Sequence, residues 1–144
     1  YELSTEVPIM TAEDYELLRI EAGMGAFGAE LTDGYNPLEA GLLHLVNFKK
    51  GCYIGQEVIA RIDSYNKVKQ RIMGFTSTTQ LPIGAEIKVD GNAVGKITSS
   101  VLSPDFGWIA LGYIRGEHAH VQSAVSVESG DGGVEAVIVG LPFE

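Results

Sequence analysis

The fold is decided by residues 86–98, which read EIKVDGNAVGKIT. Apolar and polar residues alternate on both sides of Asp90-Gly91, and an Asp-Gly pair between two alternating runs is typical of a tight β-hairpin turn. Further segments with the character of strands lie at 71–76, 108–114, 125–127 and 135–139. Strands at this regular spacing, with little helix between them, predict a small antiparallel β-barrel or sandwich.

The residues before this region predict a different structure. Thr11 is a candidate N-cap for a helix that begins at Ala12, because acidic residues crowd the first turn, where the helix dipole favours them. The spacing of Tyr15, Leu18 and Ala22 predicts that these side chains face the core. We expect the helix to stop at Gly23.

Three shorter elements are expected after this helix. Asn36-Pro37 reads as the N-cap and first residue of a short helix that runs to about Leu43. Residues 46–48 predict a short extended piece. Residues 56–62 predict one or two helical turns, with Val58, Ile59 and Ile62 on the apolar side. The character of the chain changes near residues 64 to 68, so we expect an α+β protein with a boundary there.

Composition limits the classes of function. The chain has 144 residues and a net charge of −9, so as a whole it would repel nucleic acid. No apolar run approaches the roughly 18 residues that cross a bilayer, so no membrane is expected as a partner. A single cysteine excludes an internal disulfide and favours a reducing compartment. The first residue is not Met, which leads us to expect a piece of a longer protein.

The positive charge is concentrated in one stretch. Six of the ten basic residues lie between positions 49 and 71, and only Glu57 and Asp63 oppose them there, so this stretch carries 6 − 2 = +4. It is either a solvated basic face or a local field for an anionic ligand.

Two other motifs are better explained without a ligand. Residues 23–28 read GMGAFG, but a dinucleotide site must follow a strand and open a helix, whereas this run follows a predicted helix and opens a loop. His118 and His120 lack further ligands at suitable spacing, so we interpret them as surface residues and expect no metal site.

Cys52 is the strongest candidate for a functional side chain. It lies between Gly51 and Gly55, just before the helix predicted to open at Gln56, and unpaired N–H groups there favour a thiolate. Lys49 and Lys50 act in the same direction. Nucleophilic, redox and Fe–S ligation chemistry all stay open, and a cluster would need ligands from elsewhere. The competing interpretation is a small buried apolar residue.

The residues around Cys52 also carry a family resemblance. Residues 50–57 read KGCYIGQE, which resembles the K-G-C-[FY]-x-G-Q-E signature of YgfZ-like proteins, the folate-binding relatives of the glycine-cleavage T-protein. Residues 19–23 and 27–31 are similar to the family's R-x-E-x-G and G-x-E-L runs, and 37–42 to its P-x-E-A-G-L. Residues 71–75 resemble the strand that opens the C-terminal barrel, and 141–143 resemble the usual ending.

The resemblance implies a fold and a ligand. Residues 1–65 would be the back part of a T-protein-like folate-binding region, and 66–144 the C-terminal β-barrel. Glu21 matches the glutamate that hydrogen-bonds the pterin ring, as a carboxylate suits paired N–H donors. Arg71 matches a basic position near the cofactor, and Lys67, Lys69 or Arg71 could meet the glutamate tail of folate. The expected ligand is tetrahydrofolate or a one-carbon derivative, bound with help from Lys50, Tyr53 and Gln56.

Three hypotheses for function follow. The resemblance implies a factor in Fe–S cluster assembly or repair that depends on Cys52, affects tRNA modification indirectly and works with Fe–S assembly proteins or client enzymes. Its place would be the bacterial cytoplasm or the matrix or stroma of an organelle. The second hypothesis is an aminomethyltransferase, although such enzymes usually have no cysteine in this segment. The third is a non-catalytic interaction domain in which Cys52 is inert.

Overall fold

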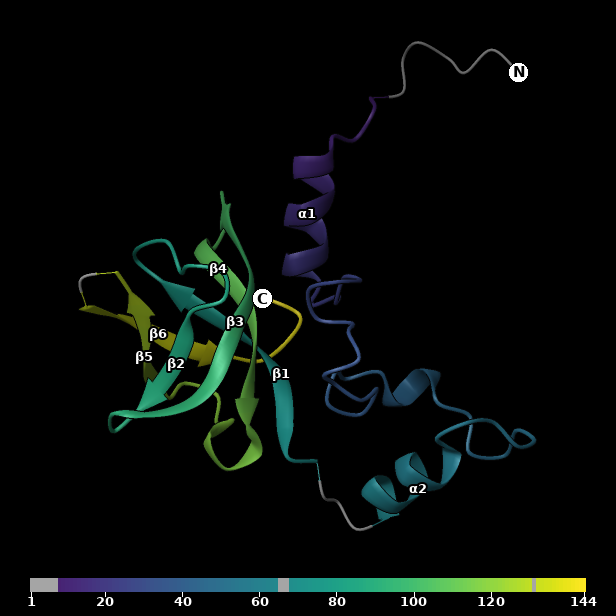
Figure 1. The fold of residues 1–144 in the computed structure, drawn as a ribbon. Helices are drawn as coiled ribbons and strands as arrows, with labels where there is room; N and C mark the ends of the chain where they lie inside the picture. The colour runs from purple at the N-terminus through teal and green to yellow at the C-terminus, as the bar shows by residue number, and fades with distance from the viewer. Residues whose placement is uncertain (1–7, 65–67, 131) are drawn as a thin grey trace.

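The computed structural model describes residues 8–64, 68–130 and 132–144, and its dominant feature is a closed antiparallel barrel (Figure 1). The strands follow one another around the barrel in the order β1-β4-β3-β2-β5-β6, and β6 pairs with β1 to close it. The prediction of a small antiparallel barrel is therefore confirmed. The strands are β1 (Gln70–Ser77), β2 (Glu86–Val89), β3 (Asn92–Ser103), β4 (Gly107–Arg115), β5 (Ala124–Ser129) and β6 (Gly132–Val139).

The turn between β2 and β3 is the one that the Asp-Gly pair predicts. Asp90 and Gly91 both have positive φ, 52° and 80°, which is the backbone of a two-residue hairpin turn of type I′. Val89 pairs with Asn92 directly across this turn. The local sequence thus sets the register of the hairpin, and the register sets which side chains face inward.

Strands β3 and β4 are paired neighbours, and each has a glycine where the two backbones approach closely. A Cβ atom added at Gly95 would lie 2.1 Å from the carbonyl oxygen of Tyr113, and one added at Gly112 would lie 2.6 Å from that of Lys96. Neither strand could keep its position with a larger residue there. The barrel interior that this packing encloses consists of Phe75, Leu81, Ile87, Val94, Ile97, Ala110, Ile114, Val125, Val127, Ala136 and Ile138.

A second apolar cluster lies on the outer face of the barrel. Ile109 and Leu111 of β4 point outward and are nevertheless fully buried. Ile20 of α1 (Ala12–Glu21) and Phe143 near the C-terminus cover them. Strand β4 is therefore buried on both of its faces, and the N-terminal helix is attached to the barrel by the same cluster.

Helix α1 begins and ends where the sequence predicts. The Thr11 side chain accepts a hydrogen bond from the Asp14 N–H at 3.1 Å, and the Asp14 carboxylate accepts one from the Thr11 N–H, which is a complete capping box. Ala22 is the C-cap, and Gly23 follows with a φ of 71°.

The predicted buried face of α1 is wrong. Tyr15 and Leu18 are 58% and 49% exposed, and Ala22 is exposed as well. Arg19 and Ile20 are the buried residues, because the helix contacts β3 and β4 along the edge that carries them. The sequence pattern correctly predicted a helix, but the side of α1 that is buried depends on where the helix meets the barrel.

The segment after α1 is less helical than predicted. The Asn36 side chain does act as a cap and accepts hydrogen bonds from the N–H groups of Leu38 and Glu39 at 3.0 and 2.9 Å. Turns follow instead of a helix, and they end at Gly41, whose φ is 73°. A 3-10 helix, η1 (Leu43–Leu45), comes next, and residues 46–48 form no strand.

Helix α2 (Gln56–Ser64) confirms the predicted helical turns and lies apart from the barrel in Figure 1. Val58, predicted on its apolar side, is 58% exposed, and the Ile62 side chain and Lys67 lie outside the described part of the chain. A short 3-10 helix, η2 (Gly116–His118), follows β4. Over the described ranges, the helices are too short and too polar for any of them to cross a membrane.

Candidate functional site

The candidate site is a hollowed face formed by residues 22–45 and the start of β1. Two cavities adjoin there and share Leu31, Ala40 and Leu42. The first, called the loop cavity, has a volume of about 460 Å³ and is lined by residues between Phe27 and Leu42. The second, called the β1 cavity, has a volume of about 780 Å³ and reaches from Ala22 across to Arg71, Ile72 and Met73.

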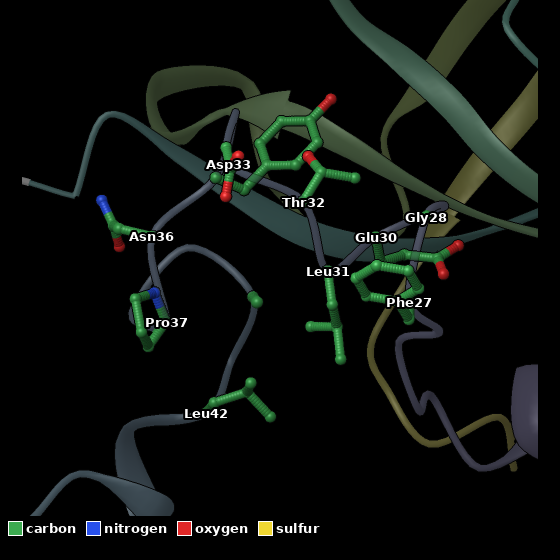
Figure 2. A pocket seen from close by; sticks show the side chains of 11 residues that line it. Phe27, Gly28, Glu30, Leu31, Thr32, Asp33, Asn36, Pro37 and Leu42 are labelled. Carbon is green, nitrogen blue, oxygen red and sulfur yellow. The ribbon is translucent and has the colours of Figure 1, made fainter.

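The loop cavity has apolar walls and a polar edge. Figure 2 shows Leu31, Pro37 and Leu42 around the hollow, whereas the Glu30 carboxylate points away from it. Thr32, Asp33 and Asn36 supply the polar edge. Apolar walls with a few polar groups at the rim are the usual lining of a site for a small organic ligand.

The loop that lines both cavities is held by a buried ion pair. Glu30 is fully buried, and its carboxylate accepts hydrogen bonds from Arg19 Nη1 at 3.2 Å, from the Ala26 N–H at 2.9 Å and from Thr98 Oγ1 at 2.7 Å. Ser99 Oγ donates to the same carboxylate. Because a buried charge is tolerated only when it is paired and hydrogen-bonded, this arrangement fixes the loop against β3.

Arg19 completes the buried pair from the side of the helix. Its guanidinium donates to Ser99 Oγ at 2.8 Å and to the Met24 carbonyl at 3.0 Å, and it also pairs with Glu16. One side chain therefore joins α1, the loop that follows it and strand β3.

Two stacked tyrosines attach the same loop to β4. The rings of Tyr35 and Tyr113 lie 3.6 Å apart at an angle of 11°, and the Tyr113 hydroxyl donates to the Glu30 carbonyl at 2.9 Å. Burial raises the pKa of the Tyr113 hydroxyl, and neighbouring Tyr35, Glu30 and Glu39 add to the effect. Burial also raises the pKa of Tyr35, with contributions from Glu39 and Glu30. Both pKa shifts favour the neutral form of the hydroxyl.

Glu39 connects the loop to β1. Its main-chain carbonyl accepts from the Ile72 N–H at 2.9 Å, and its buried carboxylate accepts from the Asn36 N–H at 3.0 Å and from Gln70 Nε2 at 3.5 Å. The walls of both cavities are thus anchored to three barrel strands, β1, β3 and β4.

The structure places two predicted ligand-binding residues beside the β1 cavity. Arg71 lines it directly from the start of β1. Glu21 ends α1 next to Ala22, which lines the cavity, but its Oε1 accepts a hydrogen bond from Ser103 Oγ at 2.7 Å. Its carboxylate therefore engages β3 through Oε1.

The other four predicted residues form a separate group on the loop before α2. Cys52 is exposed, and Tyr53 is half-buried. Gln56 Nε2 donates to the Lys50 carbonyl at 3.2 Å, which closes the loop around Cys52. Among the described residues that line the two cavities, none comes from this group. The structure brings Lys50, Cys52, Tyr53 and Gln56 together and leaves them apart from Glu21 and Arg71.

The sequence did not identify Arg19, Glu30, Tyr35 or Glu39 as site residues. Each lies within a predicted helix or a motif of the loop, but nothing local indicates that it is buried or which residue it pairs with. Over the ranges that the structure describes, no three His, Cys, Asp or Glu side chains are grouped to hold a metal ion. His118 is partly exposed with its Nε2 3.7 Å from Glu117 Oε1, and His120 is exposed.

Comparison with known proteins identifies the barrel domain. Residues 70–143 match the model of the glycine cleavage T-protein C-terminal barrel domain. A protein of Arabidopsis thaliana named as a putative chloroplastic transferase is 41% identical over 78% of this chain and 26% of its own length. An aminomethyltransferase of Nostoc sp. is 35% identical over 89% of this chain and 35% of its own length.

A solved structure extends the similarity beyond the barrel. The glycine cleavage system aminomethyltransferase T from Bartonella henselae superposes on 91% of this chain with a TM-score of 0.79 and 26% sequence identity. The match covers 38% of that chain. The chain thus spans between about a quarter and two fifths of the length of these relatives.

Proposed function

The chain belongs to the glycine cleavage T-protein family, and from this premise we propose that it is the C-terminal portion of a tetrahydrofolate-binding, YgfZ-like factor that acts in Fe–S cluster assembly or repair. The observation that carries this proposal is the exposed Cys52 within KGCYIGQE. An exposed thiol on a loop can reach a partner protein or a cluster, whereas a buried one serves only packing.

Folate binding is supported by the lining of the β1 cavity. Its walls are largely apolar, as a pterin and an aminobenzoyl ring require, and Arg71 stands at its edge, where a carboxylate of the ligand could pair with a guanidinium. Glu21 is adjacent to Ala22 of this cavity and offers a carboxylate to the N–H donors of a pterin. Tetrahydrofolate supplies or accepts a one-carbon unit when bound.

The Fe–S role is supported by the separation of Cys52 from the cavities. A thiol that took part in chemistry on the folate ring should line the same cavity as Arg71, and Cys52 does not. Its loop is closed by the Gln56 to Lys50 hydrogen bond and presents the sulfur outward, which suits contact with an assembly protein or a client enzyme.

Complementation tests the role of Cys52. The full-length protein with Cys52→Ser should fail to restore Fe–S enzyme activity and tRNA thiolation in a strain that lacks the gene, while an Ile83→Ala control on the exposed barrel surface should restore both. Full restoration by Cys52→Ser would reject the Fe–S role. Tetrahydrofolate affinity should be unchanged in Cys52→Ser and reduced in Glu21→Ala.

An aminomethyltransferase is the second candidate function, because the Nostoc relative and the Bartonella henselae structure both carry that name. In that reaction a one-carbon unit passes from an aminomethyl carrier to tetrahydrofolate. Glycine-cleavage activity of the full-length protein would favour this function over the first. If the full-length protein bound no folate, failed to restore Fe–S enzyme activity and showed no glycine-cleavage activity, the third hypothesis, an interaction domain with an inert Cys52, would remain.

The expected compartment follows from the proposed role. The Arabidopsis thaliana relative is named as chloroplastic, which supports an organelle stroma or matrix for a eukaryotic source, with the cytoplasm as the bacterial equivalent. Localisation of a fluorescent fusion of the full-length protein would test this.

A further inference from the structure

The segment that follows β6 forms one wall of the β1 cavity. Residues 140–144, called here the strap, run from the end of β6 to the end of α1 (Figure 1), where the Phe143 N–H donates to the Glu21 carbonyl at 2.9 Å. Leu141 and Pro142 of the strap line the cavity for which folate binding is proposed. A ligand in this cavity therefore meets the strap as well as the loop and β1.

The strap is held in place by few interactions. Over the described ranges, the bond between Phe143 and Glu21 is its only main-chain hydrogen bond outside the sheet ladder. The Phe143 ring is the anchor, because it is 9% exposed and packs into the second apolar cluster between α1 and β4. Pro142 and Glu144 are exposed. A segment held by one ring and one hydrogen bond opens at a lower free-energy cost than the barrel itself.

Two glycines leave room for the strap. A Cβ atom added at Gly23, at the end of α1, would lie 2.8 Å from Leu141 Cβ. One added at Gly74 of β1 would lie 2.8 Å from Phe143 Cζ and 3.0 Å from Leu141 Cδ2. It would also lie 2.9 Å from Val139 Cγ2, at the end of β6. Because Gly74 lies outside the lining of the β1 cavity, a methyl group there would press on the strap without touching a ligand.

The strap also reaches the Glu21 carboxylate, which is the predicted contact to a pterin. The rings of Phe106 and Phe143 lie 6.0 Å apart at an angle of 42°. The Phe106 N–H donates to Ser103 Oγ at 3.2 Å, and Ser103 Oγ donates to Glu21 Oε1 at 2.7 Å. Glu21 is thus connected to Phe143 through its main chain and through its side chain, so displacement of the strap would alter both connections.

We propose that the strap is a movable wall of the β1 cavity whose docking is coupled to ligand binding, with Phe143 as a positioning residue for Glu21. The docked strap presents Leu141 and Pro142 to the apolar part of a folate, and a displaced strap does not. Coupling between two equilibria is reciprocal, so a ligand holds the strap in place and release of the strap weakens binding. This inference rests on the proposed folate binding and adds to it a device that regulates affinity.

Titration of the full-length protein with tetrahydrofolate tests the coupling. Phe143→Ala removes the anchor and should lower affinity about ten-fold, whereas Phe143→Leu keeps an apolar side chain and should retain most of the affinity. Gly74→Ala should lower affinity about five-fold, although it touches no ligand. Val127→Ala is the matched control, because Val127 is buried inside the barrel and outside the cavity lining. It should destabilise the barrel and leave affinity unchanged, and thermal unfolding shows that each variant is folded at the titration temperature.

Hydrogen exchange of the wild-type protein provides a readout that needs no substitution. The Phe143 amide reports the opening of the strap, because it donates the hydrogen bond to Glu21. Without ligand it should exchange faster than the amides of β5, which exchange only when the barrel unfolds. Saturating tetrahydrofolate should slow the exchange of the Phe143 amide at least about five-fold.

The outcomes are distinguishable. Binding by the wild type with unchanged affinity in Phe143→Ala and Gly74→Ala would overturn the strap and leave folate binding in place. A loss in Val127→Ala as large as that in Phe143→Ala would also overturn it, because the effect would then come from overall stability. The same holds if bound ligand leaves the exchange of the Phe143 amide unchanged. Absence of binding by the wild type would overturn the proposed folate function and the strap together.

Discussion

Replacing Arg19 by Met should destabilise the protein by about 3 to 5 kcal/mol, because it leaves a buried carboxylate without its cation. Glu30 is fully buried, so its charge cannot recover solvation when Arg19 is lost. Methionine keeps much of the volume of the arginine stem, which limits any cavity that the substitution creates. The measured loss therefore reports mainly the unpaired charge.

The size of the effect can be bounded from the contacts that remain. Ala26 N–H, Thr98 and Ser99 would still donate to the Glu30 carboxylate, so the loss should fall near the lower end of the range. Glu30→Gln should cost less, about 1 to 3 kcal/mol, because Arg19 would keep Glu16 as its partner. The double variant should lose less free energy of unfolding than the two single variants lose together. The difference, which is the coupling energy of the pair, should be about 0.5 to 3 kcal/mol.

Urea denaturation provides the measurement, and the fluorescence of Trp108, the sole tryptophan, provides the signal. The free energy of unfolding falls by about 1 to 3 kcal/mol for each 1 M of urea. The expected loss of stability therefore lowers the midpoint of the urea transition by about 1 M or more. Arg61→Met is the matched control, because Arg61 pairs with Glu57 at 2.9 Å on the exposed surface of α2. That change should cost less than about 1 kcal/mol. If Arg19→Met cost no more than Arg61→Met, the buried pair would not hold the loop in the way described.

Three other predictions concern the barrel, the stacked tyrosines and the exposed thiol. Gly95→Ala should destabilise the barrel by about 3 kcal/mol or more in the same assay, since its Cβ would lie 2.1 Å from a carbonyl oxygen, whereas Gly51→Ala, with open space around it, should change stability by less than about 0.5 kcal/mol. Burial raises the pKa of Tyr113 in the folded state, so above about pH 10 the unfolded chain loses this proton before the folded chain does. The contribution of the neutral hydroxyl to stability is therefore complete below about pH 10 and is lost as the pH rises from there through the folded-state pKa. Stability should therefore fall less steeply above pH 10 in Tyr113→Phe than in the wild type, and equal slopes would contradict the burial of that hydroxyl. Cys52 should react fully with a thiol reagent in the native protein without denaturant, and protection of the thiol would contradict its exposed position.

The barrel could be predicted because its determinants are local. The Asp90-Gly91 turn and the alternation on either side of it fix a hairpin before any distant contact forms, and β5 shows the same alternation of buried and exposed residues. The ends of α1 are local as well, since Thr11 and Gly23 act within one turn of the helix. Its buried side was not predictable, because the apolar spacing of Tyr15 and Leu18 says nothing of where the barrel lies.

The candidate site was predictable only in part, for the same reason. The Cys52 segment is contiguous in sequence, so it could be identified without the fold. Glu30 meets Thr98 and Ser99 across 68 and 69 residues of chain, and Tyr35 meets Tyr113 across a similar interval. No local pattern carries that information. Whether a polar residue of the loop is solvated or buried is decided when the loop reaches the outer face of the barrel.

The burial of β4 on both faces limits how the barrel domain could be transferred to another protein. Ile109 and Leu111 are covered by Ile20, which lies in α1 outside the residues of the barrel, as well as by Phe143. A fragment cut to residues 70–143 would keep every barrel strand and still expose part of this apolar patch to water. Such a patch is prone to aggregate unless another surface covers it. The smallest portable module is therefore the barrel together with helix α1, and a boundary placed by strand pairing alone would cut through a shared core.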